Sequence, residues 1–154
     1  MKKLFNVIMT LVSSVCVMSF TSCSSESYEG FDFDEYNAAL TYTVSSDGNT
    51  VVYRGENNTK IQIEEYVFDG CALSAINVKR EIECGTPDNA VLIGVGVSEN
   101  PELSKSNGYD VTVTWDGSKV YVNGTRDIYD EVASLTQEQL VAYLSKKAEA
   151  ANSK

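Results

Sequence analysis

The sequence predicts an α+β fold, built mainly from an antiparallel sheet of about seven strands with one helix at the C-terminus. Apolar and polar residues alternate along several segments, as expected for strands with one buried face. Two Asp-Gly dipeptides stand between such segments, where they favour two-residue hairpin loops. The last part of the chain changes to helical spacing. The same elements are also compatible with a small β-barrel or a β-sandwich with an appended helix.

The first 22 residues have the composition of a secretory signal peptide. Lys2 and Lys3 give a positive start, and the apolar stretch that follows ends at Phe20. Polar residues interrupt this stretch, which leaves it short of the roughly 20 apolar residues that a spanning helix needs. We therefore expect residues 1–22 to be removed during export.

Small residues stand directly before Cys23, in the order Phe20, Thr21, Ser22. This stretch resembles the lipobox of bacterial lipoproteins, in which the cysteine is acylated and becomes the first residue. Phe in place of the preferred Leu resembles the lipoprotein signals of Bacteroidota. The resemblance implies that Cys23 anchors the protein by palmitate-type chains in the cell outer membrane, on its periplasmic or its surface side. The alternative is a secreted protein, cleaved nearby, with a spare cysteine.

The mature chain divides into a short tether and one domain. Residues 23–37 are rich in serine and acidic residues and predict a lipidated, solvated tether. Residues 38–154 predict a single β-rich domain with a C-terminal helix, since a chain of this size supports one core. Ten basic and 22 acidic residues follow position 22, which gives a formal charge of −12. Such a polyanion is not expected to bind nucleic acid.

The cysteines predict a disulfide rather than a metal site. Cys16 leaves with the signal peptide and Cys23 carries lipid, so Cys71 and Cys84 remain in the exported domain. In an oxidising compartment we expect this pair to form a disulfide, which would contribute about 3 kcal/mol. The chain has no histidine, and two cysteines this far apart do not suggest zinc.

The first hairpin is predicted around the sequence "TYTVSSDGNTVVY". If Asp47-Gly48 forms the two-residue loop, Val44 faces Val51. The apolar residues of the two strands then lie on one face, which supports the pairing.

The second hairpin is predicted over residues 109–123, with Asp116-Gly117 as its loop and Val113 facing Val120. Its opposite face is polar. This face is a candidate surface for binding a carbohydrate or a protein, and otherwise an ordinary solvent-facing side of the sheet. The candidate residues are Thr112, Thr114 and Tyr121.

Three further strands are predicted between the hairpins, at 60–68, 76–84 and 90–97. The last of these is apolar on both faces, which is typical of a central strand. Residues 98–108 have the composition of a loop.

The C-terminal segment predicts an amphipathic helix. Thr136 is placed to cap its first turn with Gln139 at the third helical position, and Leu135 and Leu140 occupy the positions of a hydrophobic staple. We expect the helix to pack on the sheet, with a partner-binding or membrane-lying helix as the alternative. Its apolar stripe consists of Leu140, Val141, Leu144 and Ala148.

The residue types argue against catalysis. Without histidine, Ser-His-Asp and Cys-His chemistry is excluded. A pair of carboxylates remains able to hydrolyse glycosides. In so acidic a chain, however, surface acids are expected everywhere, and "DFDE" or "SSDGNT" do not make a calcium loop. The acidic candidates are Asp32, Asp34, Glu35, Glu64, Glu65 and Glu81.

The stretch "VTVTWDGSKVYVNGT" is similar to a hairpin of concanavalin-like, laminin-G-type lectin domains, where it is structural. From the sequence we predict an envelope lipoprotein that is a non-catalytic binding or interaction module without a cofactor. Its partner would be an envelope protein or a glycan. The alternative is a lipocalin-like carrier with an enclosed apolar cavity; a lectin-like glycan binder or a hydrolase is more distant.

Overall fold

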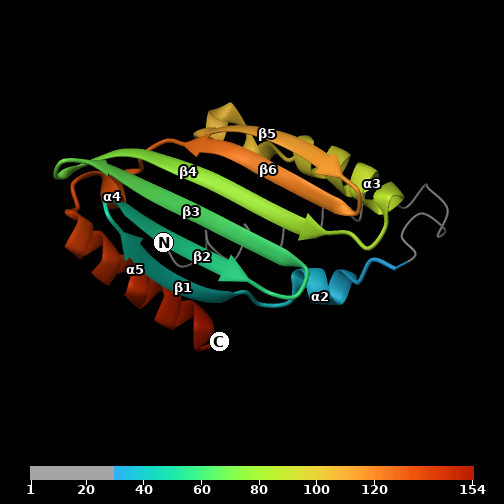
Figure 1. Ribbon diagram of the computed structural model, residues 1–154, viewed down its shortest axis with the longest axis horizontal. Helices are drawn as coiled ribbons and strands as arrows, with labels where there is room; N and C mark the ends of the chain where they lie inside the picture. The colour runs from blue at the N-terminus through green and yellow to red at the C-terminus, as the bar shows by residue number, and fades with distance from the viewer. Residues whose placement is uncertain (1–29) are drawn as a thin grey trace.

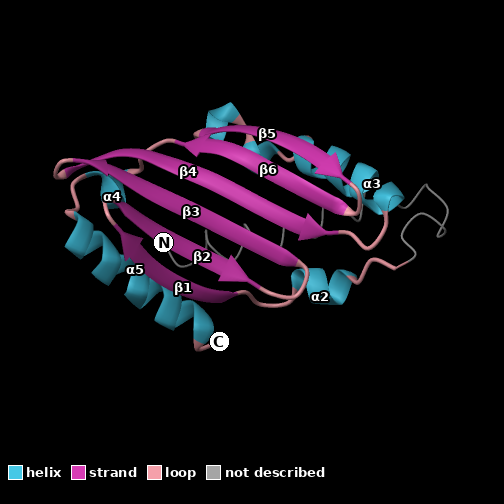
Figure 2. Ribbon diagram, in the orientation of Figure 1, coloured by secondary structure: helices cyan, strands magenta, loops and turns pink. Residues whose placement is uncertain are grey.

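The computed structural model describes residues 30–154 and contains one open, six-stranded antiparallel sheet in the order β1-β2-β3-β4-β6-β5 (Figure 1). Helices α3 and α5 pack against opposite ends of one of its faces (Figure 2). The strands are β1 Thr41–Asp47, β2 Thr50–Glu56, β3 Lys60–Asp69, β4 Ala72–Glu83, β5 Tyr109–Asp116 and β6 Lys119–Arg126. The helices are α2 Phe33–Asn37, α3 Pro87–Ser98, α4 Asp130–Ala133 and α5 Gln137–Asn152, with 3-10 turns η2 Pro101–Leu103 and η3 Lys105–Asn107.

The α+β class and the antiparallel sheet are confirmed, but the predicted strand at 90–97 is wrong. This segment lies within helix α3. Thr86 caps the helix by accepting a hydrogen bond from the Asn89 backbone, Pro87 occupies the first turn, and Asp88 carries its negative charge there. These start signals outweigh the β propensity of the valines that follow. The sheet therefore has six strands rather than seven, and it is open rather than closed or two-layered.

Both predicted hairpins form, but each pairs two residues away from the predicted register. The loops are Gly48-Asn49 and Gly117-Ser118, so that Val44 faces Tyr53 instead of Val51. Each glycine has a positive φ and the residue after it does not. This is the pattern of a type II′ turn, which places glycine at the first central position rather than the second. A shift of two residues leaves every side chain on its predicted face.

The β3–β4 hairpin repeats this design with the loop Gly70-Cys71. Of the four β-hairpins in the described part of the chain, the three with two-residue loops use a glycine followed by a non-glycine residue, whereas the β2–β3 hairpin turns through Asn57, Asn58 and Thr59. They form an antiparallel meander over β1 to β4, to which the β5–β6 hairpin is added through β6.

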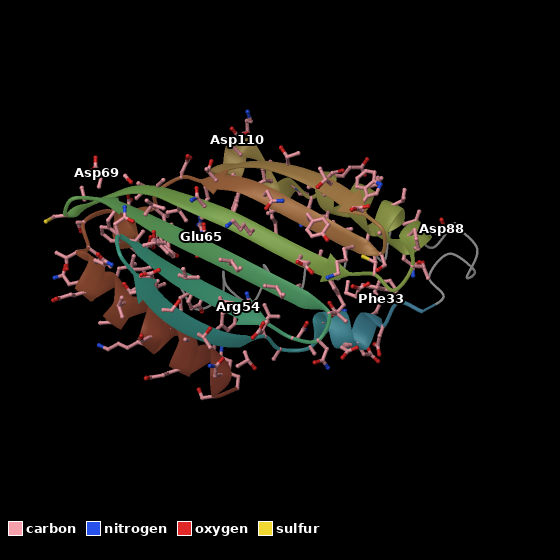
Figure 3. All side chains as sticks on the ribbon, in the orientation of Figure 1. Phe33, Arg54, Glu65, Asp69, Asp88 and Asp110 are labelled. Carbon is pink, nitrogen blue, oxygen red and sulfur yellow. The ribbon has the colours of Figure 1, made fainter. Side chains whose placement is uncertain are left out.

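The apolar core is split into two clusters on the helix-covered face. The larger cluster, which we call the α5 half, is formed by α4, α5 and the ends of β2, β3 and β4. The smaller cluster, the α3 half, lies under α3 and contains Phe31, Ile82, Cys84, Ala90 and Val120. Within the described residues, no helix packs on the other face of the sheet, which we call the outward face. Arg54 and Glu65, labelled in Figure 3, belong to it.

The folded domain begins earlier than the predicted boundary at residue 38. Phe31 is buried in the α3 half and contacts the rings of Phe33 and Tyr36. Asp32 caps α2 by accepting a hydrogen bond from the Glu35 backbone. Residues 31–37, predicted as part of a solvated tether, therefore belong to the domain, because the aromatic side chains supply apolar area to bury. The predicted signal peptide and Cys23 lie outside the described residues.

The predicted start of the C-terminal helix is confirmed. Thr136 and Gln139 form a reciprocal capping box at the first turn of α5. Of the predicted stripe, Leu140, Leu144 and Ala148 are buried in the α5 half. The helix packs on β1 and β2, as expected for an amphipathic helix beside an open sheet.

Candidate functional site

Charged side chains gather on the helix-covered face between the two apolar clusters. Glu64 of β3 lies there beside Tyr53 and Val78, and Arg126 comes from the end of β6. The Arg126 Nη1 atom donates to Glu64 Oε1 at 2.7 Å, and both side chains are only about a fifth exposed. This partly buried ion pair is the strongest candidate for a chemically special site in the described residues.

Two tyrosines complete this cluster, which we call the Glu64 network. The Tyr66 hydroxyl donates to Glu64 Oε2 at 2.5 Å and lies 2.9 Å from the Tyr129 hydroxyl. The Arg126 guanidinium lies over the Tyr129 ring, 4.4 Å from its centroid, which adds a cation–π contact. Both carboxylate oxygens of Glu64 are thereby occupied.

The ionisation of the network does not favour proton transfer near neutral pH. Burial by itself would raise the pKa of Glu64. The hydrogen bond from Tyr66 and the cations Arg126 and Lys147 outweigh burial and hold this pKa below its ordinary value. Burial, reinforced by the Glu64 carboxylate, raises the pKa of Tyr66 far above its ordinary value, and burial raises that of Tyr129 to about 12. The carboxylate therefore stays ionised while the phenols stay neutral, which suits a structural network.

Lys60, at the start of β3, is a second partly buried cation. Burial, together with the charge of Arg80, lowers the pKa of its amine to about 8. The amine donates to the Tyr36 carbonyl at 3.0 Å and lies 4.3 Å from the centroid of the Tyr36 ring. These contacts tie α2 to the sheet.

The four glutamates considered for glycoside hydrolysis each bind a different partner. Glu65 pairs with Lys79 at 2.7 Å on the outward face, and Glu81 pairs with Lys119 at 2.5 Å. Glu35 accepts a hydrogen bond from the Asn58 side chain. Over residues 30–154 no group of three or more potential metal-ligating side chains occurs.

The predicted binding residues do come together on the outward face. Thr114 faces Tyr121 across the β5–β6 hairpin, and the neighbouring Thr112 faces Asn123. Both threonines are exposed and Tyr121 is half-buried. The β5–β6 hairpin is thus solvent-facing on its polar side.

Two aliphatic neighbours of this surface, Ile61 and Ile63, were not predicted as binding residues. Ile61 lies in one row with Glu81, Tyr121 and Thr114, in which each residue faces the next across adjacent strands. Ile63 lies one row further along β3. Their alternation with polar residues along 60–68 places them opposite the buried Tyr66 and Phe68, and this period-two pattern was the signal available in the sequence.

The predicted Cys71–Cys84 disulfide is absent, and both thiols are free. Cys71 lies in the exposed β3–β4 turn, whereas Cys84 follows the last residue of β4 and is buried in the α3 half. A 12-residue strand separates them, which at about 3.3 Å per residue spans roughly 40 Å and is far beyond the reach of a disulfide. Burial raises the pKa of the Cys84 thiol to about 11, which disfavours the reactive thiolate.

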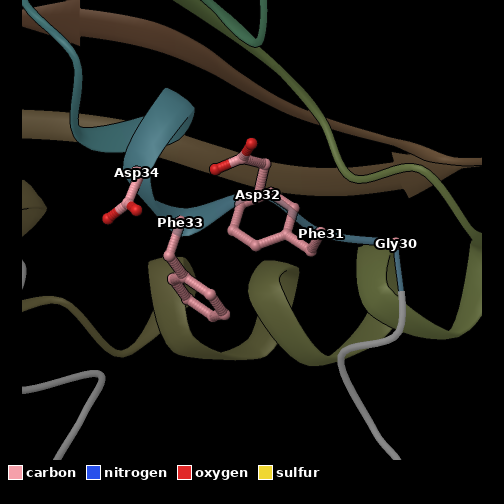
Figure 4. Close-up of a pocket in the computed structure, with 5 residues that line it drawn as sticks. All are labelled: Gly30, Phe31, Asp32, Phe33 and Asp34. Atoms are coloured by element: carbon pink, nitrogen blue, oxygen red, sulfur yellow. The ribbon is translucent and has the colours of Figure 1, made fainter.

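A shallow depression of about 480 Å³ lies beside the start of the domain and is lined by Gly30 to Asp34 (Figure 4). Phe31 and Phe33 supply its apolar side chains, and Asp32 and Asp34 its carboxylates. The depression is open to solvent. It does not have the enclosed shape that a lipocalin-like carrier requires.

Residues 30–154 form no helix that is both long enough and apolar enough to cross a bilayer. Comparison of the chain with models of known protein families, with curated proteins and with solved structures found no match in any of the three.

Proposed function

We propose that this protein is a lipid-anchored envelope lipoprotein that serves as a non-catalytic binding module. Cys23 would carry the acyl chains in the outer membrane, and the domain would present its outward face to an envelope protein or a glycan. The support for the anchor is the leader of the sequence, in which Thr21 and Ser22 precede Cys23 after an apolar stretch.

The main support for a binding role is that the outward face of the sheet is uncovered in the described part of the chain. No described helix packs on it, and it combines polar residues with half-exposed aliphatic ones, such as Ile61 and Ile63 beside Tyr121 and Thr114. A non-obligate interface is about as apolar as the rest of a protein surface, so this mixed composition is compatible with binding. By contrast, the most buried charged cluster has its carboxylate oxygens occupied by Arg126 and Tyr66, which leaves it without a free acid or base.

The anchor is tested by replacing Cys23 with serine and fractionating the cells. We expect the unmodified chain in the membrane fraction with the mass of attached acyl chains, and the variant in the soluble fraction without them. Cys71→Ser is the matched control, because it also removes one thiol but should leave the anchor intact. Membrane retention of the Cys23 variant with an unchanged mass would refute the anchor.

The binding role is tested with a photoreactive amino acid placed at Thr114 in intact cells. A discrete cross-linked product is expected from this position, on protein or on glycan, and none from the same amino acid at Glu149. Glu149 is an exposed residue of α5 and serves as the control. Equal, diffuse labelling from both positions would contradict an outward-face binding surface.

A further inference from the structure

The two edge strands of the sheet differ in how their outer backbone groups are satisfied. At the β1 edge, helix α5 supplies side chains that act as a substitute strand. The Asn152 amide accepts from the Tyr42 N–H and donates to the Tyr42 carbonyl, both at 2.8 Å. At the other end of β1, the Gln137 amide donates to the Ser46 hydroxyl and to the Gly48 carbonyl, both at 2.9 Å. The β1 edge is therefore blocked at both ends.

At the β5 edge, α3, η2 and η3 contact the strand, but among the described residues none of them bonds to the backbone of Val111, Val113 or Trp115. Hydrogen bonding in an antiparallel pair alternates, and Asp116 with Lys119 is the closing bonded pair of the β5–β6 hairpin. The N–H and C=O groups of Val111, Val113 and Trp115 therefore point away from β6. Among the described residues, none of these three has a hydrogen bond beyond the sheet. The edge also lacks the proline, lysine or bulge that usually protects an edge strand.

An exposed apolar patch flanks this open edge on the helix-covered side. Trp115 is 42% exposed, and Val91 and Val95 on α3 are each 42% exposed. Gly94 of α3 brings the helix against the indole so closely that a Cβ at this position would collide with the ring. Figure 1 shows α3 next to β5. The patch is thus continuous with the free backbone groups of the edge.

The charges beside the β5 edge indicate which kind of segment would bind there. On the outward face, the exposed Asp110 and Asp116 stand near the two ends of β5, with Thr112 and Thr114 between them; Asp110 pairs with Lys105 at 3.1 Å, so the unpaired negative charge lies at the Asp116 end. A second copy of this chain would bring the same acidic strand and a strongly negative domain against it. The residues just after Cys23 include Glu26 and Glu29 and no basic residue, which makes them a poor match as well. A basic segment of another protein is the complementary occupant.

We propose that the β5 edge binds an extended segment of another protein by strand addition. The segment would alternate apolar residues, which contact Trp115, Val91 and Val95, with polar residues, and would carry lysine or arginine at the end beside Asp116. Backbone hydrogen bonds to Val111 and Val113 would supply affinity, and the flanking charges would supply selectivity. This inference rests on the proposed binding function and names its partner chemistry, but it requires neither the lipid anchor nor the outward-face residues Ile61 and Tyr121.

The test uses the full chain in detergent and a nine-residue peptide in which valine and threonine alternate between two lysines. Trp115 is the only tryptophan of the chain, so its fluorescence reports binding at this edge. We expect a saturable change in emission with this peptide. The same peptide methylated at alternate backbone nitrogens should bind at least tenfold more weakly, because it has lost donors worth about one hydrogen bond each. No saturable change, or equal binding of the methylated peptide, would overturn the proposal.

Val113→Pro is the matching protein variant. Its N–H points away from β6, so proline removes a donor from the free edge while the β5–β6 hydrogen bonds remain. Val44→Pro is the control, since Val44 holds the equivalent position on the covered β1 edge and is likewise partly buried. We expect peptide affinity to fall at least tenfold in the first variant and to stay within twofold in the second. Equal affinities would contradict strand addition at β5.

Charge selectivity gives an independent readout that does not depend on proline. Asp116→Lys should weaken binding of the lysine-flanked peptide and favour a peptide flanked by glutamates. If sedimentation instead shows that the full chain forms a dimer through this edge, and Val113→Pro abolishes it, the occupant is a second copy and the proposal is wrong. Cross-linking from Thr114 and anchoring by Cys23 are separate measurements. A negative result with the peptide would therefore contradict strand addition without contradicting the proposed function.

Discussion

The α5 half and the α3 half of this domain use the same device, a helix laid against one end of a sheet face, with different results. In the α5 half, the helix buries Leu140, Leu144 and Ala148 and also satisfies the β1 edge through Asn152. In the α3 half, the helix buries only Asn89, Ala90 and Gly94 fully and leaves Val91 and Val95 exposed. One half is therefore closed and provides stability, whereas the other retains unused contact area and hydrogen-bonding groups.

The largest difference between the halves should appear in core truncations. Leu144→Ala removes a side chain that is fully buried in the α5 half, and we expect a loss of about 3 kcal/mol in the free energy of unfolding. Ile93→Ala in the partly buried flank of the α3 half should cost about 1 kcal/mol, in line with the smaller area it buries. Urea denaturation of the two variants measures both values. Equal losses would show that the two clusters are equally packed.

The next effect concerns the Glu64 network, which lies between the halves. Glu64→Gln should cost about 2 kcal/mol, because Arg126 keeps its charge in a partly buried place without its counterion. Glu65→Gln is the matched control on the outward face, where loss of the Lys79 ion pair should cost about 0.5 kcal/mol. A similar cost for both variants would mean that the network is no stronger than a surface pair.

The Glu64 variant should also change the pH dependence of stability. The folded-state pKa of Glu64 lies below its ordinary value, so its ionisation stabilises the fold above the unfolded pKa of about 4.3. This contribution is lost as the pH falls through the folded pKa. Thermal unfolding of the chain and of Glu64→Gln should therefore differ at pH 7 and converge at acidic pH. A constant difference down to the lowest pH would argue against the ionised pair as the cause.

A smaller effect is expected from opening the closed edge. Asn152→Ala removes both hydrogen bonds to the Tyr42 backbone and should cost about 1 kcal/mol. Hydrogen exchange at the Tyr42 amide should accelerate and approach the rate at Val113 on the open edge. Ser153→Ala is the control, because Ser153 bonds only within its own helix, to the Ala150 carbonyl. Unchanged exchange at Tyr42 would show that Asn152 does not protect the edge.

The last effect concerns Lys60, which contacts Tyr36 beside the α3 half, and it appears only at alkaline pH. Burial lowers the folded-state pKa of its amine to about 8, below its unfolded value, so the unfolded chain binds more protons between these two pH values. Stability should therefore rise with pH above about 8 through this group, and Lys60→Met should flatten that rise. Thermal unfolding measured from pH 7 to 10 checks this. An equally steep rise in the stability of the variant would show that other groups cause the pH dependence.

Some features followed from the sequence because they depend on neighbouring residues. The capping box of Thr136 and Gln139 needs only a spacing of three, and it forms as predicted. The faces of the two hairpins also follow from local alternation, which explains why Thr112, Thr114 and Tyr121 share the outward face despite the shifted register. The shift itself comes from turn chemistry, because the glycine of each Asp-Gly pair takes the first central position of its loop rather than the second.

Other features depended on residues far apart in the chain. Leu92 and its neighbours have a strand-like composition, and only their place after the Thr86 cap and against β5 and β6 makes them a helix. The number of cysteines predicted a Cys71–Cys84 disulfide. In the structure, the 12-residue strand β4 separates the two residues, so they lie at opposite ends of this strand. Arg126 was not singled out, since its ion pair with Glu64 spans 62 positions of sequence.

By itself, the sequence determined the α+β class, the faces of the strands and the start of the last helix, because each of these is set by short-range periodicity and capping. Only the tertiary structure decided which edge of the sheet is covered, how the core divides and where buried charges meet. These depend on strand order and on helices that close over particular edges, and no local pattern encodes contacts between residues separated by most of the chain.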